Sequence, residues 1–214
     1  MSTINAIILT DDSAGDNSLK DFFLQLSRDS EILLSRYCAQ NNIQLAISSL
    51  CSDDFDKNTL STQLAEVNER RFLNLWFAHG NVEELHNAGE KVVSLSENYY
   101  LFTNALVYTF SCSNGDELAD ALIMNGTLSF LGYARTAYVP YNLDDEVASV
   151  ALLGLTAFLK GESLYNAVEE MRDGYTSLAK SDEIEPMARI LLEVNAQGLV
   201  LKGRKDLTIN DMII

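Results

Sequence analysis

The chain has 214 residues, and 47% of them are hydrophobic, which is enough to form one full hydrophobic core over residues 1–214. Its formal net charge of −16 argues against nucleic acid as the main partner, because binding to phosphate needs clustered lysine and arginine. No apolar run has the length of a membrane-spanning helix or the pattern of a signal peptide, so we expect a single-domain cytoplasmic protein that does not enter a membrane.

The first third of the chain alternates between two kinds of pattern. Short apolar runs predict strands and amphipathic spacing predicts helices, at 4–10 (strand), 18–40 (helix), 43–50 (strand), 58–70 (helix) and 72–78 (strand). This βαβαβ order is typical of a parallel sheet with helices on both faces. We therefore predict a three-layer α/β/α sandwich with a mostly parallel central sheet.

The pattern weakens between Gly80 and Asn104. There the sequence predicts a short turn of helix at 81–86 and a small strand at 92–95. A break of this size between two strands could shape a substrate cleft.

The rest of the chain returns to strands and then becomes helical. Further elements are predicted at 106–110 (strand), 118–123 (helix), 127–133 (strand), 144–161 (helix), 164–171 (helix), 186–198 (helix), 199–201 (strand) and 207–209 (strand). We expect the helical portion, about 141–198, to pack on the sheet.

Cys112 gives the strongest chemical signal in the sequence. It follows the apolar strand 106–110 within Ser111-Cys112-Ser113-Asn114-Gly115, and a helix begins directly afterwards. The backbone N–H groups and the positive dipole end of a helix N-terminus favour a thiolate, and a nearby base could complete its activation.

His79 is the candidate base, because it ends the preceding predicted strand, 72–78. In a parallel sheet the carboxyl ends of neighbouring strands lie at the same edge, so His79 and Cys112 could meet there. The alternative is a buried structural cysteine and an unrelated histidine, since cysteine is among the most buried residue types.

These residues resemble the caspase-like (clan CD) cysteine peptidases, and most closely the bacterial gingipain and CHAT types. The shared pattern is His79-Gly80 at one strand tip, Ser111–Gly115 around a cysteine at the next, Leu118-Ala119 in the following helix, and a strand ending in Gly132-Tyr133. The caspase signature Gln-Ala-Cys-x-Gly is replaced by Phe-Ser-Cys-Ser-Asn, so caspase specificity is not implied.

The resemblance implies hydrolysis of peptide bonds in a peptide or protein substrate, without a metal or an organic cofactor. Cys112 matches the nucleophile of the family and His79 its general acid/base. Gly80 matches the residue whose backbone N–H helps to bind the oxyanion, and the N–H of Cys112 would be the second donor. The sequence leaves open a regulatory protein partner and a homo-oligomer.

Substrate preference has two opposite candidates among the charged residues. Asp11 and Asp12, at the tip of the first strand, could bind a basic side chain of the substrate, or they could simply cap a turn. Arg135 could instead pair with an acidic side chain, or it could face water. Tyr133 could form a wall of the pocket, or it could belong to the core.

Two further functional classes remain open beside the cysteine endopeptidase. One is a catalytically inactive relative that uses the same fold as a scaffold or protein-binding module. The other is a flavodoxin-like or receiver-like domain with Mg²⁺ at Asp11 and Asp12, which ranks last because His79 stands where a receiver needs an aspartate. The negative charge is compatible with basic protein partners, or it serves only solubility.

The remaining histidine and cysteines suggest no separate chemistry. His86 lies beside Glu83 and Glu84 without a third metal ligand at a regular spacing, so we expect a solvated loop histidine. Cys38 and Cys51 are expected to be packing residues, and three cysteines without metal-site spacing suit a reducing compartment.

Overall fold

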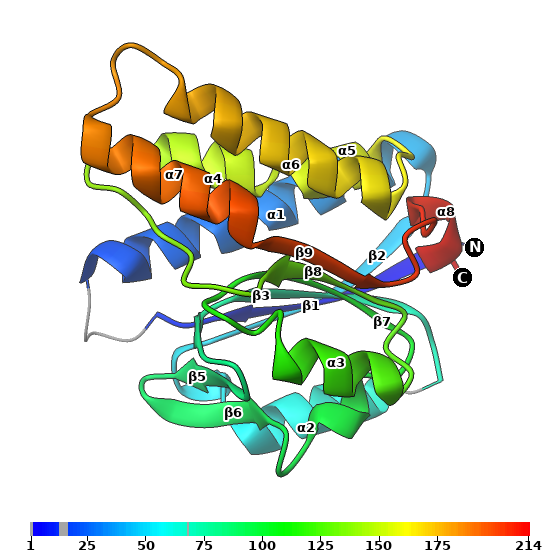
Figure 1. Cartoon of the computed structure of the whole chain (residues 1–214). Helices are drawn as coiled ribbons and strands as arrows, with labels where there is room; N and C mark the ends of the chain where they lie inside the picture. The colour runs from blue at the N-terminus through cyan, green and yellow to red at the C-terminus, as the bar shows by residue number, and fades with distance from the viewer. Residues whose placement is uncertain (1, 13–16, 68) are drawn as a thin grey trace.

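A six-stranded sheet runs through the middle of the computed structural model, which describes residues 2–12, 17–67 and 69–214 (Figure 1). Its strand order is β2-β1-β3-β7-β8-β9. The first five of these strands are parallel, and β9 runs antiparallel to β8. The strands are β1 (Thr3–Thr10), β2 (Gln44–Cys51), β3 (Phe72–Phe77), β7 (Ala105–Phe110), β8 (Ser129–Tyr133) and β9 (Leu199–Gly203).

Helices cover both faces of the sheet, which confirms the predicted three-layer α/β/α sandwich (Figure 1). One face is covered by α1 (Asn17–Asn41), α4 (Asp144–Ala151), α5 (Leu153–Leu159), α6 (Leu164–Ala179) and α7 (Pro186–Gly198). The other is covered by α2 (Lys57–Glu66) and α3 (Glu117–Met124), and the shorter elements are α8 (Ile209–Met212) and the 3₁₀ helices Ser52–Asp54 and Tyr99–Phe102.

Successive side chains of a strand point to opposite faces of the sheet and belong to two separate hydrophobic clusters. In β1, Ile4, Ala6 and Ile8 belong to the cluster under α1 and α4–α7, whereas Ile7 and Leu9 belong to the cluster under α2 and α3. A strand that is buried on both faces needs mostly apolar residues on both sides, which is why the central strands appear in the sequence as nearly continuous apolar runs, with buried polar residues such as Asn5 and Asn74 as exceptions.

The segment after β3 differs from the sequence prediction. Residues 81–86 were expected to form a turn of helix, but a small antiparallel sheet forms there from β4 (His79–Gly80), β5 (Glu84–Asn87) and β6 (Glu90–Ser94). The Asn81 side chain accepts the backbone N–H groups of Glu83 and Glu84, each at 2.9 Å, which closes a tight turn instead of a helix. The small strand expected at 92–95 is confirmed as part of β6.

The helix expected at 144–161 is broken in two at Leu152. The hydroxyl group of Tyr108 donates to the carbonyl of Ala151 and accepts the N–H of Leu155 at 3.2 Å. Ala151 and Leu155 would otherwise bond to each other in a continuous helix, so a side chain from the sheet has been inserted into the helical ladder.

The C-terminal segment also differs in one element. A strand was expected at 207–209, but Ile209 begins the short helix α8, and Thr208 and Asp211 form a capping box at its start. None of the helices in the described residues is long and apolar enough to cross a membrane.

Candidate active site

The two predicted catalytic residues follow neighbouring strands at the same level. β3 and β7 are adjacent and parallel, and Phe77 of β3 is the register partner of Phe110 of β7. His79 and Cys112 each lie two residues beyond that pair in their own chain segments. Both therefore lie at the carboxyl edge of the sheet, where α/β folds place their ligand sites.

Cys112 begins a sharp turn that is fixed from the side of β8. Ser113 has a φ of 60°, in the left-handed region, so the chain reverses directly after the cysteine. The Ser113 N–H donates to the Arg135 carbonyl at 3.0 Å, and the Gly115 N–H donates to the Tyr133 carbonyl at 2.8 Å. These two bonds hold Cys112 beside the chain that leaves β8.

The loop that leaves β8, residues 134–143, forms one side of the site. The Cys112 thiol lies 3.8 Å from the Ala137 carbonyl oxygen on this loop. Asn195 of α7 is completely buried, and it accepts the Tyr138 N–H and donates to the Tyr138 carbonyl, both at 2.8 Å. A helix side chain thus pins the loop one residue beyond its contact with the thiol.

The electrostatic surroundings of Cys112 differ from those that the sequence predicts. Burial raises the pKa of the Cys112 thiol, and the contact with the Ala137 carbonyl only partly opposes this effect. The helix that was expected to favour a thiolate begins at Glu117, within one residue of its predicted start and five residues after Cys112, and its first turn carries acidic Glu117 and Asp120. The resting thiol is therefore neutral at pH 7, and a base must deprotonate it.

His79 is half-buried at the start of the small sheet. Its ring packs edge-on against Phe23 of α1, with 5.4 Å between the ring centroids. It pairs across the ladder with His86. Within the described residues, no hydrogen bond joins the His79 ring to the Cys112 thiol.

Asn114 ties the two strand tips together, a role that the sequence analysis did not assign to it. Its side chain is completely buried, accepts the Ser111 hydroxyl, and donates to the carbonyls of Asn81 and Glu84, the latter at 2.8 Å. A side chain at Gly80 would meet the Asn114 Cγ at 2.9 Å. The glycine is therefore required by the close approach of the two tips. In the sequence, Asn114-Gly115 indicates only a turn.

The predicted oxyanion donors are the backbone N–H groups of Gly80 and Cys112. The Asn81 N–H donates to the Glu84 carbonyl at 2.9 Å. Because bonded and non-bonded pairs alternate in an antiparallel ladder, the next pair, Gly80 and Leu85, is non-bonded, and the Gly80 N–H points away from β5. The Cys112 N–H has no acceptor among the described residues.

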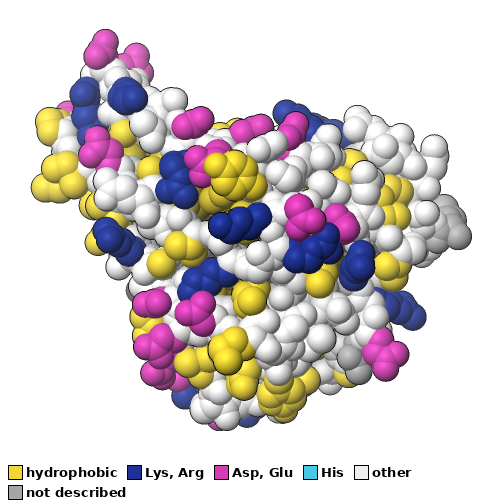
Figure 2. Space-filling model, turned by 45° about the vertical axis from the view of Figure 1, so that its right-hand side comes forward, with side chains coloured by type: hydrophobic (Ala, Val, Ile, Leu, Met, Phe, Trp, Pro, Cys, Tyr) yellow, Lys and Arg dark blue, Asp and Glu magenta, His cyan; other side chains and the backbone are white. Residues whose placement is uncertain are grey.

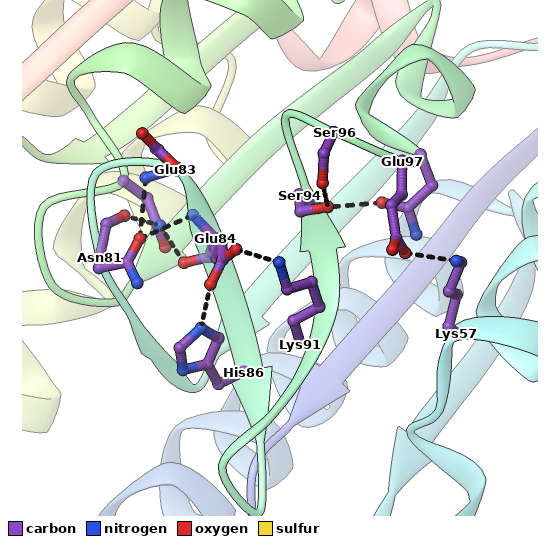
Figure 3. Close-up of polar contacts among 11 residues, drawn as sticks. Lys57, Asn81, Glu83, Glu84, His86, Lys91, Ser94, Ser96 and Glu97 are labelled. Carbon is purple, nitrogen blue, oxygen red and sulfur yellow. Dashed lines mark hydrogen bonds and ion pairs between the residues drawn. The ribbon is translucent and has the colours of Figure 1, made fainter.

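A polar cluster occupies the outer face of the small sheet (Figure 3). Glu84 bonds to Lys91 and to His86, and these two contacts lower the pKa of Glu84 to about 2. Lys57, at the start of α2, pairs with Glu97 beyond β6. His86 thus has a carboxylate partner, and the described residues contain no group of three or more His, Cys, Asp or Glu arranged to hold a metal ion.

The two aspartates at the tip of β1 hold backbone groups. Asp11 is buried, and its carboxylate accepts the Ala88 N–H at 3.3 Å. The Asp12 carboxylate accepts the N–H of Ser52 at 2.7 Å and also the Ser52 hydroxyl. Both carboxylates therefore bind loops that are distant in the sequence, 77 residues away for Asp11 and 40 residues away for Asp12.

The two residues at the end of β8 have opposite surroundings. Tyr133 is 1% exposed and bonds through its hydroxyl to Tyr175 at 2.7 Å, so a role as pocket wall is corrected to that of a core residue. Arg135 is exposed next to the Cys112 turn, and its side chain has no ion-pair partner among the described residues.

Neither a protein-family model nor a curated protein matches this chain. The resemblance to caspase-like cysteine peptidases therefore stays a prediction from the residues of the two strand tips. What can be argued about function comes from the geometry of this edge of the sheet.

Proposed function

We propose that the protein is a cysteine endopeptidase in which Cys112 is the nucleophile and His79 the general acid/base. The observation that carries the proposal is the position of both residues two steps beyond the register pair Phe77 and Phe110, on adjacent parallel strands. The close approach of Gly80 to Asn114 supports it, because the two tips themselves are in contact.

The reaction needs three groups, and each has a candidate. His79 takes the proton from the Cys112 thiol, the sulfur forms a bond to the carbonyl carbon, and the oxyanion accepts hydrogen bonds from the N–H groups of Gly80 and Cys112. The C–N bond then breaks as His79 returns the proton to the leaving amine. Water subsequently hydrolyses the thioester, again with His79 as base.

The raised pKa of Cys112 sets the order of these steps. A thiol that is neutral at rest has to lose its proton to His79 as the sulfur attacks, so the enzyme depends on general-base catalysis instead of a preformed thiolate. Catalytic hydrogen bonds are often long without substrate and shorten when it binds. The His79 side chain then has to approach the thiol on substrate binding.

Arg135 favours an acidic side chain in the substrate. Its guanidinium group is exposed and without an ion-pair partner among the described residues, and its carbonyl binds the Cys112 turn. Asp11 and Asp12 hold backbone groups and are less suited to bind a basic side chain. We therefore extend the proposal to peptides with aspartate or glutamate before the cleaved bond.

A fluorogenic peptide library tests the activity. In a Cys51→Ser background, which removes the exposed cysteine, we expect cleavage that Cys112→Ala abolishes and His79→Ala reduces by about 10²–10⁴-fold. His86→Ala is the matched control and should retain the activity. Cleavage that persists in Cys112→Ala would contradict the proposal.

A scaffold without catalytic activity is the second candidate. Two observations favour it, namely the raised pKa of Cys112 and the absence of a bond between its thiol and His79 within the described residues. Two results together would establish the scaffold. The folded wild-type protein would cleave no library peptide, and its Cys112 would react with a peptide-based thiol probe no faster than in His79→Ala.

A further inference from the structure

A groove of about 550 Å³ lies at the far end of the loop that follows β8. Tyr141 and Leu143 line it from the loop, and Ile184, Met187 and Leu191 line it from α7 and the segment before it. Tyr141 is 90% exposed and Met187 is 67% exposed. Single exposed apolar side chains are ordinary, but several around one concave surface mark a place where another molecule binds.

The apolar surface continues beyond the groove itself. Ile190, one turn after Met187 on α7, is also exposed. Figure 2 shows this corner of the molecule, where α6 and α7 meet, at its upper left, with hydrophobic and charged side chains on its surface. An apolar strip that extends along a helix fits an elongated occupant better than a small molecule.

The charged side chains that line the groove are all acidic. Its described lining includes Glu183 and Glu185, both exposed, and neither lysine nor arginine. Neither glutamate forms an ion pair with a described residue. Arg189 of α7 turns back and donates to the carbonyls of Ser181 and Ile184, at 3.1 and 2.8 Å. The groove therefore presents apolar walls and two exposed glutamates that form no ion pair with a described residue.

We propose that this groove is a docking site for a basic amphipathic segment of a partner protein. Leucine-type side chains of the partner enter between Tyr141 and Met187, and its lysine or arginine side chains meet Glu183 and Glu185. The net charge of −16 of the whole chain adds to the attraction at longer range.

The groove lies close to the candidate active site along the chain. Pro140 lines it, and Ala137, whose carbonyl is 3.8 Å from the Cys112 thiol, is three residues earlier. Three residues span at most roughly 10 Å, so one wall of the groove lies within that distance of the loop residue that contacts the Cys112 thiol. The proposal itself does not depend on catalysis by Cys112.

Direct binding to the Cys112→Ala variant of the 214-residue chain tests the proposal without interference from cleavage. The probe is a fluorescein-labelled 14-residue peptide with leucine and lysine at helical spacing, measured by fluorescence anisotropy. We expect saturable binding at micromolar concentration. A peptide with glutamate in place of lysine, and one with the same residues scrambled to remove the apolar face, should each bind at least tenfold more weakly.

Matched variants locate the binding. Met187→Ser with Tyr141→Ser, and separately Glu183→Lys with Glu185→Lys, should each weaken binding of the lysine peptide at least tenfold. Met124→Ser on α3 and Glu170→Lys on α6 change an exposed apolar and an exposed acidic residue elsewhere, and should bind within twofold of the parent. The four variants change six exposed residues in all, and equal melting temperatures verify the fold.

Three results would overturn the proposal. The first is no binding of the lysine peptide up to millimolar concentration. The second is equal binding by the groove variants and the two controls, which would indicate unspecific attraction to an acidic protein. The third is a dimer in sedimentation analysis that Met187→Ser dissociates, because a second copy of the chain would then be the occupant.

Discussion

Two completely buried asparagines hold opposite sides of the candidate site, and they do so in different ways. Asn114 joins the tips of β3 and β7, because it follows Cys112 in the chain and binds carbonyl groups next to Gly80. Asn195 projects from α7 and binds both backbone groups of Tyr138, as a neighbouring strand would. The first sets the relative position of the two candidate catalytic residues, and the second only supports the loop.

Asn114 and Asn195 are equally buried, but we expect them to influence the candidate site to different extents. Each asparagine loses its bonds on truncation, and in each case part-buried backbone groups lose their partners. Only the loss of Asn114 is expected to move His79-Gly80 relative to Cys112. Substitutions at the two positions can therefore separate stability from function.

Asn114→Ala should give the larger effect of the two. The variant leaves the carbonyls of Asn81 and Glu84 and the Ser111 hydroxyl without the amide, so we expect the free energy of unfolding to fall by about 2–4 kcal/mol. Activity on the best library peptide should fall on the order of 100-fold, because the tips lose their contact. Urea unfolding and kcat/KM measure the two effects.

The control is Asn125→Ala, since Asn125 is half-buried and its side-chain amide makes a single bond among the described residues, to the Tyr100 carbonyl at 2.9 Å. We expect a loss of stability of about 1 kcal/mol or less there, with unchanged activity. Full activity in a folded Asn114→Ala protein would contradict the role assigned to this residue.

Asn195→Ala should reduce stability to a similar extent but activity much less. Two hydrogen bonds to Tyr138 are lost, so the free energy of unfolding should fall by about 2–3 kcal/mol. The loop keeps its bond from Ser113 to Arg135, and we expect kcat/KM within roughly tenfold of wild type. Asn166→Ala, an exposed asparagine that binds Glu162, is the control. An activity loss as large as that of Asn114→Ala would remove the distinction between the two sides.

Arg135→Glu tests whether the loop after β8 contributes to substrate specificity. An exposed guanidinium contributes about 1 kcal/mol to an ion pair, so cleavage after aspartate or glutamate should fall roughly fivefold relative to cleavage after alanine. Lys180→Glu, which reverses an exposed charge at the end of α6, should leave that ratio unchanged. A ratio that does not respond to Arg135→Glu would exclude this residue from substrate binding.

Glu84→Gln, in the small antiparallel sheet, should have the smallest effect of these substitutions, a small loss of stability. The pKa of Glu84 is lowered to about 2 by Lys91 and His86, so its carboxylate stabilises the folded state above pH 4.5, and this contribution disappears as the pH falls towards 2. At pH 7 we expect the free energy of unfolding of wild type to exceed that of Glu84→Gln by about 1 kcal/mol or less. The difference should shrink to zero in acid. A constant difference from pH 7 to pH 2 would contradict the pKa shift.

The strands and their tips are predictable from the sequence because their cause is local. A strand buried on both faces is a continuous apolar run, and His79 and Cys112 mark where two such runs end. The features that were missed depend on contacts between distant residues. Tyr108 breaks a helix more than 40 positions away, at Ala151, and Asn114 reaches the turn after Gly80. Nothing in the adjacent sequence of either residue indicates its partner.

The electrostatic prediction at Cys112 was wrong for a related reason. The sequence indicates the following helix and its start near residue 118, but not that the loop after β8 would cover the thiol. Burial, which raises the pKa, depends on that loop. The assignment of Tyr133 to a pocket wall was wrong because Tyr175, which covers it, comes from α6.

The rate at which a peptide-based thiol probe alkylates Cys112 tests the central claim most directly, because the bound peptide stands in for the substrate that brings His79 to the thiol. In the Cys51→Ser background, labelling of Cys112 is followed by mass spectrometry from pH 6 to 10, with the buried Cys38 as an internal reference. Because the pKa of the thiol is raised above its ordinary value of 9.0, His79→Ala should react at least tenfold more slowly than wild type at pH 7 and approach it above pH 9. His86→Ala should behave as wild type. Equal rates in all three proteins at pH 7 would contradict the pairing of Cys112 with His79.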